Sequence, residues 1–133
     1  MAAPAEVAAA GPGPLNEVRL VGRLSADPEV RTLPSGDTVV QLRVVVAREA
    51  GPSGASRRRR PGLVDTIDVS VWAKAGQRAA LRLRAGDGVG VDGALRRRFW
   101  RSAGGPSSRY EVEASAVRRV GRAPRVRSRT MAG

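Results

Sequence analysis

The stretch that decides the fold is Asp65-Thr66-Ile67-Asp68-Val69-Ser70-Val71-Trp72, in which apolar and polar residues alternate. Successive side chains of a β-strand point to opposite faces, so a strand with one buried face shows apolar residues at every second position. Ile67, Val69 and Val71 form that apolar set. Trp72 therefore falls in the polar register, where a core tryptophan is not expected.

A second alternating stretch occupies residues 89–100. Its apolar register consists of Val89, Val91 and Leu95. Its polar register consists of Asp92, Arg96, Arg98 and Trp100. One β-bulge would reverse this assignment, because an extra residue shifts every later side chain to the other face. Phe99 shares the register of Leu95 and is expected to pack in the core or in a hairpin, and Tyr110 stays unassigned.

The same patterns organise the rest of the chain. We expect strands at residues 16–24, 38–47, 64–72, 89–100 and 110–117, and one helix at residues 73–84. Two prolines and a Pro-Ser-Gly turn within residues 27–36 separate the first two strands, and residues 102–108 predict a glycine-rich hairpin. This order predicts an all-β fold, a five-stranded Greek-key barrel of the OB-fold kind, with one helix between strands three and four.

The composition of the ends predicts a single folded domain at residues 15–120. Residues 1–14 are rich in alanine, glycine and proline and predict a disordered leader, and residues 121–133 predict a disordered basic tail. Residues 57–60 are four consecutive arginines inside a glycine- and serine-containing segment. We expect a mobile basic loop there, which adds nucleic-acid affinity without specificity.

The charge of the chain indicates a polyanionic partner. Of 133 residues, 24 are basic and 12 are acidic, which gives a formal net charge of +12, and Lys74 is the single lysine. Such an excess of arginine favours nucleic acid as the partner. The alternative is that a GC-rich genome has raised the arginine, alanine and glycine content and that much of the charge is merely solvated.

Missing residue types argue against several function classes. The chain has no cysteine and no histidine, so it lacks thiolate chemistry and the usual neutral metal ligand and general base. Asp65 and Asp68 fall on opposite faces of their strand and do not form a metal pair. We therefore expect no enzyme activity, no metal and no cofactor. No apolar run approaches the ~18 residues of a membrane span, so we expect no membrane partner and a cytoplasmic, nucleoid-associated location.

Tryptophans among arginines suggest how the partner is held. A single strand of nucleic acid exposes flat base faces as well as phosphates, and aromatic side chains stack on bases. We expect Trp72 and Trp100 to stack in this way. The polar strand registers supply the candidate phosphate contacts Arg19, Arg23, Arg43, Arg96 and Arg98. For Arg19 and Arg23 an equally weighted alternative is that the first strand faces another subunit or solvent.

The chain resembles the bacterial single-stranded DNA-binding proteins over about residues 16–120. The matching residues are Asn16-x-Val18-x-Leu20-Val21-Gly22-x-Leu24, Asp27-Pro28-Glu29-Val30-Arg31-x-x-Pro34-x-Gly36, Trp72-Ala73-Lys74, Gly86-Asp87, and Leu95-Arg96-x-Arg98-x-Trp100 with Arg109-Tyr110-Glu111-Val112. The resemblance implies base stacking by Trp72 and Trp100. It also implies a homotetramer or another homo-oligomer, and a DNA path that includes Arg31, Lys74, Arg96 and Arg98.

The sequence departs from the family pattern at several points. Thr66 stands where the family often has tryptophan, residues 49–51 contain no aromatic residue, and Ala73 replaces the usual glycine. Replicative members end in an acidic tip that recruits other DNA-processing proteins, whereas this sequence ends in an arginine-rich segment. We therefore expect weaker binding per nucleotide, no recruitment through an acidic tip, and a short actinobacterial-type paralogue.

The expected function is sequence-independent binding of single-stranded DNA in replication, repair or recombination. Two alternatives stay open. An RNA-binding or ribosome-associated OB-fold protein would share the basic charge and the exposed aromatic residues. An accessory subunit could instead pair through its first strand with another single-stranded DNA-binding chain and modulate it.

Overall fold

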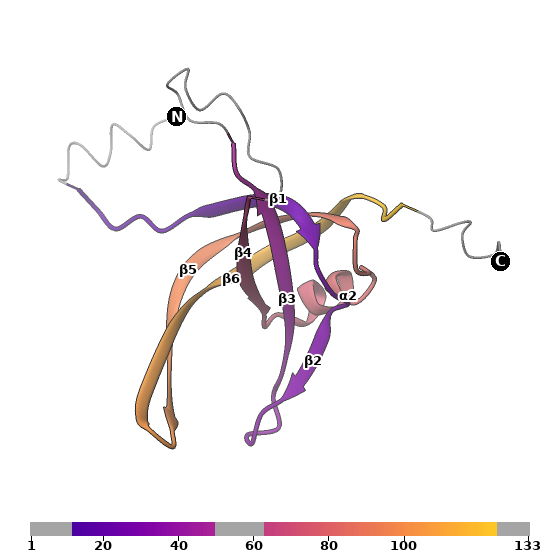
Figure 1. Cartoon of the computed structure of the whole chain (residues 1–133). Helices are drawn as coiled ribbons and strands as arrows, with labels where there is room; N and C mark the ends of the chain where they lie inside the picture. Colours follow the sequence, from indigo (N-terminus) through magenta and orange to yellow (C-terminus); the bar gives the residue numbers. More distant parts are fainter. Residues whose placement is uncertain (1–11, 50–62, 125–133) are drawn as a thin grey trace.

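Alternating valine-rich stretches fold as β-strands in the computed structural model (Figure 1). In chain order the elements are β1 (Val18–Leu24), β2 (Glu29–Thr32), β3 (Thr38–Ala47), β4 (Val64–Val71), α2 (Lys74–Ala80), β5 (Gly88–Ser102) and β6 (Gly105–Gly121). The structure describes residues 12–49 and 63–124. Most of the expected leader, the four arginines at residues 57–60 and most of the expected basic tail lie outside the described residues.

Five of the strands close into a barrel. Neighbouring strands pair in the order β1-β5-β6-β4-β3, and the end of β1 pairs back with β3. Every one of these pairings is antiparallel except that of β4 with β6. The short strand β2 adds to the free edge of β3. The all-β, five-stranded OB-fold barrel predicted from the sequence is therefore confirmed.

One strand and the end of the helix differ from the prediction. Residues 29–32 form β2 where only a turn was expected, which puts the helix between β4 and β5 rather than between the third and fourth strands. All four side chains of β2 are exposed, so no apolar alternation marks it in the sequence. The helix ends at Ala80 rather than at residue 84. Leu83 lies in the turn that follows: its backbone N–H donates to the Ala80 carbonyl, and its side chain is buried in the core. Within residues 12–49 and 63–124, no helix has the length and apolarity needed to cross a membrane.

The last two strands are longer than predicted and leave the barrel together. β1 pairs with β5 only as far as Gly93, and β4 pairs with β6 only at Val112 and Glu113. Residues 94–111 therefore form a two-stranded ribbon, the hairpin arm, which projects downward in Figure 1. The predicted burial of Leu95 is wrong, because no further described strand pairs with the arm and this side chain is 45% exposed. Phe99, which was expected in the core or in a hairpin, lies in the hairpin with 71% of its surface exposed.

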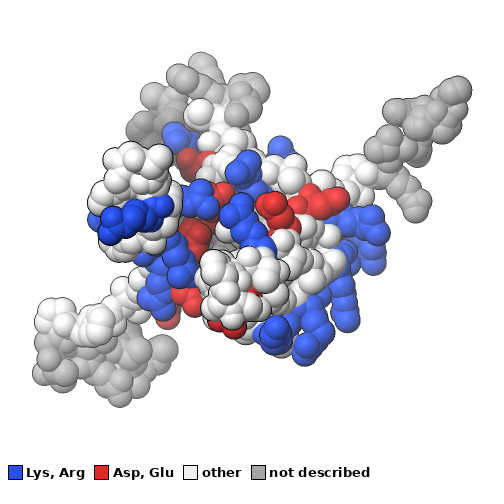
Figure 2. All heavy atoms as spheres, turned by 90° about the horizontal axis from the view of Figure 1, so that it is seen from below, with Lys and Arg blue, Asp and Glu red and all other residues white. Residues whose placement is uncertain are grey.

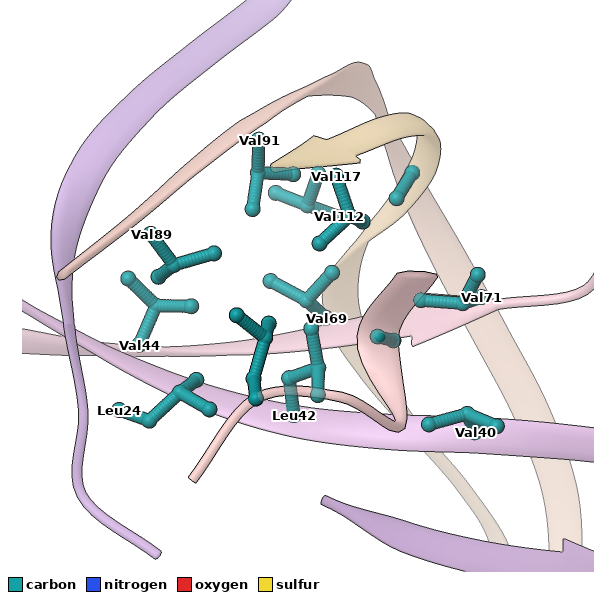
Figure 3. Packing of buried hydrophobic residues seen from close by; sticks show 13 residues of the cluster. Leu24, Val40, Leu42, Val44, Val69, Val71, Val89, Val91, Val112 and Val117 are labelled. Carbon is teal, nitrogen blue, oxygen red and sulfur yellow. The ribbon is translucent and has the colours of Figure 1, made fainter. Parts of the chain in front are cut away.

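Small aliphatic side chains fill the barrel. Leu24, Val40, Val44, Val69 and Val89 are at most 1% exposed and converge inside the barrel (Figure 3). Full burial of a valine or leucine side chain is worth about 1.5–3 kcal/mol. The core cluster contains no aromatic side chain. All four aromatic residues of the chain consequently lie outside it.

The barrel closes through a glycine on β1. Gly22 pairs with Val89 of β5, and the next residue, Arg23, pairs with Val45 of β3. A Cβ atom on Gly22 would overlap the backbone carbonyl oxygen of Val45. The absence of a side chain at this position lets β1 approach β3 closely enough to complete the ring of strands.

Asp87 ties the turn after the helix to the end of the barrel domain. Its carboxylate accepts hydrogen bonds from the backbone N–H of Arg84 at 2.8 Å and of Ala123 at 2.7 Å, and from Arg119 Nε at 3.2 Å. These contacts join the turn after the helix to the end of β6. The two backbone donors, assisted by the Arg119 guanidinium, lower the pKa of Asp87 below its usual value of 3.8 in spite of burial.

We expect Asp87→Asn to lower the melting temperature at neutral pH, because an amide cannot accept all the bonds made by the carboxylate. A carboxylate with a lowered folded-state pKa contributes stability that is present above the usual pKa of 3.8 and is lost as the pH falls through the folded-state pKa. The difference between wild type and variant should therefore shrink in melts recorded below pH 3.8. Asp65→Asn, which removes an exposed partner of Arg48, is the control and should change the melting temperature little. An Asp87→Asn variant as stable as wild type at pH 7 would contradict the assignment.

Candidate nucleic-acid interface

A groove lies between the hairpin arm and the β2–β3 hairpin, which project from the same side of the barrel (Figure 1). It has a volume of about 490 Å³ and is lined by Arg31, Leu33, Val39, Gln41, Ser70, Trp72, Arg98, Phe99, Trp100, Arg109 and Glu111. In β4, Ser70 alternates with the core residues Val69 and Val71, so the outer face of the sheet forms part of the groove. Two tryptophans that are distant in the sequence thus share one hollow.

Each tryptophan of the groove has an arginine over its ring. Arg98 Cζ lies 5.0 Å from the centroid of the Trp72 ring, and Arg109 Cζ lies 5.9 Å from that of Trp100. The negative face of an indole ring attracts a cation such as a guanidinium. Trp100 is 45% exposed and Trp72 is half-buried. The groove therefore combines flat apolar surfaces with planar cations.

The backbone of Trp72 is held by a buried glutamine of α2. Gln77 Nε2 donates to the carbonyl oxygens of Thr38 at 2.9 Å, Val71 at 3.0 Å and Trp72 at 3.2 Å, and its Oε1 accepts from Thr38 Oγ1 at 3.2 Å. The helix is thereby fixed to the start of β3 and to the end of β4. Trp72 Nε1 is buried and has no hydrogen-bond partner among the described residues. The Gln77 bond to the Trp72 carbonyl fixes the backbone from which the indole projects.

Carboxylates accompany the arginines of this surface. Arg98 Nε donates to Glu111 at 2.7 Å, and Glu111 is only 5% exposed. On the neighbouring surface Asp68 lies 3.6 Å from Arg43 and 3.7 Å from Arg109. Seen from below, basic and acidic side chains are interspersed on this side of the molecule (Figure 2). The local positive charge is consequently much smaller than the number of arginines suggests.

The groove continues past β3 into a second hollow. That hollow is lined by Ala26, Asp27, Glu29, Arg31, Gln41, Leu42, Arg43, Asp68, Val69 and Arg109. It shares Arg31, Gln41 and Arg109 with the groove. An extended ligand can therefore follow one continuous path from the tryptophans to Arg43.

The predicted site residues separate into two groups. Those that line this path are Trp72, Trp100, Arg31, Arg43 and Arg98. Those that do not line it are Arg19, Arg23, Lys74 and Arg96. Arg19 lies on β1 and pairs with Asp92 at 3.4 Å, Arg96 pairs with Glu113 at 2.9 Å, and Lys74 begins the helix.

Sequence reasoning did not select several residues of the path. Arg109 falls just before the predicted strand at residues 110–117, because β6 already begins at Gly105. Glu111 falls inside the predicted strand but was not selected as a site residue. A hairpin register with a tight turn at residues 103–104 would have put Arg109 opposite Arg98 and Glu111 opposite Arg96, as in the structure. Gln41 and Ser70 lie in the polar registers of their strands, but no charge or aromatic ring distinguishes them.

Comparisons with known proteins agree on one family. A sequence model described as the single-strand binding protein family matches residues 15–120. Single-stranded DNA-binding protein 1 of Synechocystis sp. is 28% identical over 109 residues, which cover 80% of this chain and 84% of the relative. The single-stranded DNA-binding protein of Treponema pallidum is 30% identical over 112 residues, which cover 80% of this chain and 58% of the relative. The chain spans about half the length of several further relatives.

A solved structure has the same fold. It is described as a Plasmodium falciparum SSB complex with ssDNA, and it matches with a TM-score of 0.64 at 20% identity. The match covers 83% of this chain and 98% of the other.

We expect Gln77→Ala to destabilise the protein by about 1–3 kcal/mol, because buried carbonyl groups lose their donor. In a Trp100→Phe background, in which Trp72 is the only tryptophan, the emission of Trp72 should also shift. Urea unfolding and emission spectra test both effects. Arg78→Ala, an exposed position on the same helix, is the matched control. A Gln77→Ala variant with unchanged stability and emission would show that Trp72 is held by other contacts.

Proposed function

This chain belongs to the single-strand binding protein family, whose sequence model matches residues 15–120, and we propose that it binds single-stranded DNA without sequence preference. The groove carries the proposal, because two indoles and several arginines line it together. Such a surface suits a strand that exposes both bases and phosphates. It does not suit a duplex, whose base faces are stacked and inaccessible.

Bases stack on Trp72 and Trp100 in the proposed complex. Base–aromatic stacking is worth about 1–3 kcal/mol per base and tolerates any base, because every base has a flat face. In the free protein, Arg98 and Arg109 lie over these rings. An incoming base therefore either displaces the guanidinium or stacks against it. A displaced arginine remains within the groove, where it can contact a phosphate.

Phosphates compete with carboxylates for the arginines of the path. When Arg43 and Arg109 bind DNA, their ion pairs with Asp68 are broken or weakened. Arg31 has no ion-pair partner among the described residues, so it can bind a phosphate without breaking such a pair. Each neutralised phosphate of a single strand adds a slope of about −0.7 to the dependence of log affinity on log salt. The binding should thus be salt-dependent.

The proposal extends to the setting of this activity. The protein acts as a binding protein without a catalytic step, protects or organises exposed strands in replication, repair or recombination, and works in the cytoplasm near the nucleoid. We also propose that the protein assembles as a homo-oligomer, a proposal that the family resemblance supports. The mass of the protein by light scattering tests that assembly.

Titration with oligo-dT, the matching RNA and duplex DNA at several salt concentrations tests the proposal. We expect tighter, salt-dependent binding to oligo-dT with quenching of tryptophan fluorescence. Trp72→Ala combined with Trp100→Ala should weaken binding, by about 1–3 kcal/mol for each lost stack, while the salt slope, followed by the anisotropy of a labelled oligonucleotide, stays nearly unchanged. Equal or tighter binding to RNA would favour the ribonucleoprotein alternative. Binding only in a mixture with another single-stranded DNA-binding chain would favour an accessory subunit.

A second prediction concerns Asp68. Asp68→Asn should tighten binding to oligo-dT by about two- to fivefold at low salt, because an exposed ion pair worth roughly 0.5–1 kcal/mol no longer has to be broken. Arg31→Ala is the opposite control: it should weaken binding and reduce the magnitude of the salt slope by about 0.7. If Asp68→Asn instead weakened binding, Asp68 would be positioning Arg43 and Arg109 rather than competing with DNA.

A further inference from the structure

The side chain of Asn16 takes the place of a strand at the base of the hairpin arm. Its Oδ1 accepts a hydrogen bond from the Leu95 N–H at 2.8 Å, and its Nδ2 donates to the Leu95 carbonyl at 2.8 Å. Val18 pairs with Gly93 in the antiparallel register of β1 with β5, so residue 16 lies opposite residue 95. The amide thus makes the two bonds of the next backbone pair, and the pairing of β1 with β5 ends there.

Beyond Leu95 the outer edge of β5 has free backbone groups. In an antiparallel strand the N–H and C=O groups of alternate residues point to the same edge. Since those of Leu95 point outward to Asn16, those of Arg97, Phe99 and Arg101 point outward as well. No described strand pairs with this part of β5 except β6, on its other side. We call Arg97, Phe99 and Arg101 the open edge.

The edge of the arm along β6 is different. Pro106 lies opposite Arg101 in the ribbon, at a position whose N–H would point outward. A proline has no N–H, so it leaves the ladder between β5 and β6 intact and interrupts the outer edge of β6. The open edge is therefore the edge of the arm that is suited to take up a further strand.

Nothing among the described residues covers the open edge. The side chains of Arg97, Phe99 and Arg101 are exposed, and residues 12–17 run away from the arm (Figure 1). Free donors and acceptors on a strand edge are a template for an extended peptide, a recurring mode of protein recognition. A nucleic-acid backbone fits less well, because its phosphates accept hydrogen bonds but cannot donate to the outward carbonyl groups.

The charge of the open edge favours an acidic peptide. Arg96 and Arg98, on the opposite face of the ribbon, each have a carboxylate within 4 Å. Arg97 and Arg101 have none among the described residues, and Arg97 is held only by Ser108 Oγ and two aromatic rings. A second copy of the arm would bring the same arginines together, and like charges on neighbouring strands are destabilising. Acidic side chains opposite Arg97 and Arg101 are instead stabilising.

We propose that the open edge binds an extended acidic segment of another protein, which adds to the arm as an antiparallel β-strand. Backbone hydrogen bonds to Arg97, Phe99 and Arg101 hold the segment, and the two guanidinium groups select its carboxylates. The arm then connects the protein to a partner through its edge. This binding does not depend on the proposed binding of DNA.

A labelled peptide tests the proposal. The probe has about seven residues, within the usual length of a strand: threonine at every odd position, and glutamate, valine and glutamate between them. In the antiparallel pairing its glutamates face Arg97 and Arg101, and its valine faces Phe99. Fluorescence anisotropy at low salt should show saturable binding. N-methylation of the two glutamates and the valine removes the donors to the open edge and should weaken binding by about tenfold or more. N-methylation of the inner threonines, whose N–H groups point away, is the matched control and should change the affinity little.

Two variants at one position separate the backbone from the charge. Arg101→Ala removes a guanidinium and should weaken peptide binding by about two- to fivefold. Arg101→Pro also removes an outward N–H and should weaken it by about tenfold or more, while the ladder with β6 stays intact. Arg78→Ala, an exposed position on the helix, should have no effect. Circular dichroism verifies that each variant is folded.

Four results would overturn the open edge as a peptide site. They are no saturable binding of the unmodified peptide, equal binding of the two methylated peptides, and displacement of the peptide by saturating short oligo-dT, which would put the peptide in the groove. The fourth is a loss of oligo-dT affinity in Arg101→Pro that is absent in Arg101→Ala, which would assign the edge to DNA instead. Peptide binding by a protein that binds no oligo-dT would support the peptide site while contradicting the proposed function.

Discussion

The pairing of β1 with both β5 and β3 is the constraint on which the rest of the structure depends. Gly22 permits it, because a side chain there would meet the Val45 carbonyl. Closure encloses a core of valine, leucine and alanine, and it uses β5 only as far as Gly93. The remaining length of β5 and β6 then has no place in the barrel and extends as the hairpin arm. One wall of the groove is thus a direct consequence of how the barrel closes.

The large net positive charge of the chain is not concentrated at the candidate site. The net charge is +12, yet the arginines nearest the tryptophans are balanced by Asp68, Glu111 and Glu113. Glu111 is almost fully buried, and removal of Arg98 would leave it without its closest partner, which is costly. Arg98 is therefore a structural residue as well as a candidate contact. Local pairing orients these side chains in the free protein, and in the proposed complex the excess positive charge of the chain raises the rate of encounter with DNA.

The alternation of apolar and polar residues predicted the strands well where one face of the strand is buried. It failed where neither face is buried. Residues 38–47 form β3 as expected, since their apolar register packs in the barrel. β2 was missed because it is exposed throughout, and Leu95 was misassigned because the pattern continues beyond the barrel. The pattern also states which side chains share a face but not what lies opposite that face. For this reason it could not separate Arg43, which lines the path, from Arg19, which lies on β1 and pairs with Asp92 of β5.

The distribution of aromatic residues links the fold to the function. The core of this barrel is filled by valine, leucine and alanine side chains, so none of the four aromatic residues is needed for it. Each of the four nevertheless has an arginine guanidinium within 6 Å of its ring. Three of them lie on the hairpin arm, and Trp72 is reached by an arginine of the arm. An arginine on a ring keeps the ring partly desolvated, presents a planar cation to solvent, and leaves the pair ready to exchange one flat partner for another. The arm therefore presents three of the four aromatic residues, each beside an arginine, on a ribbon that the closed barrel holds away from its core.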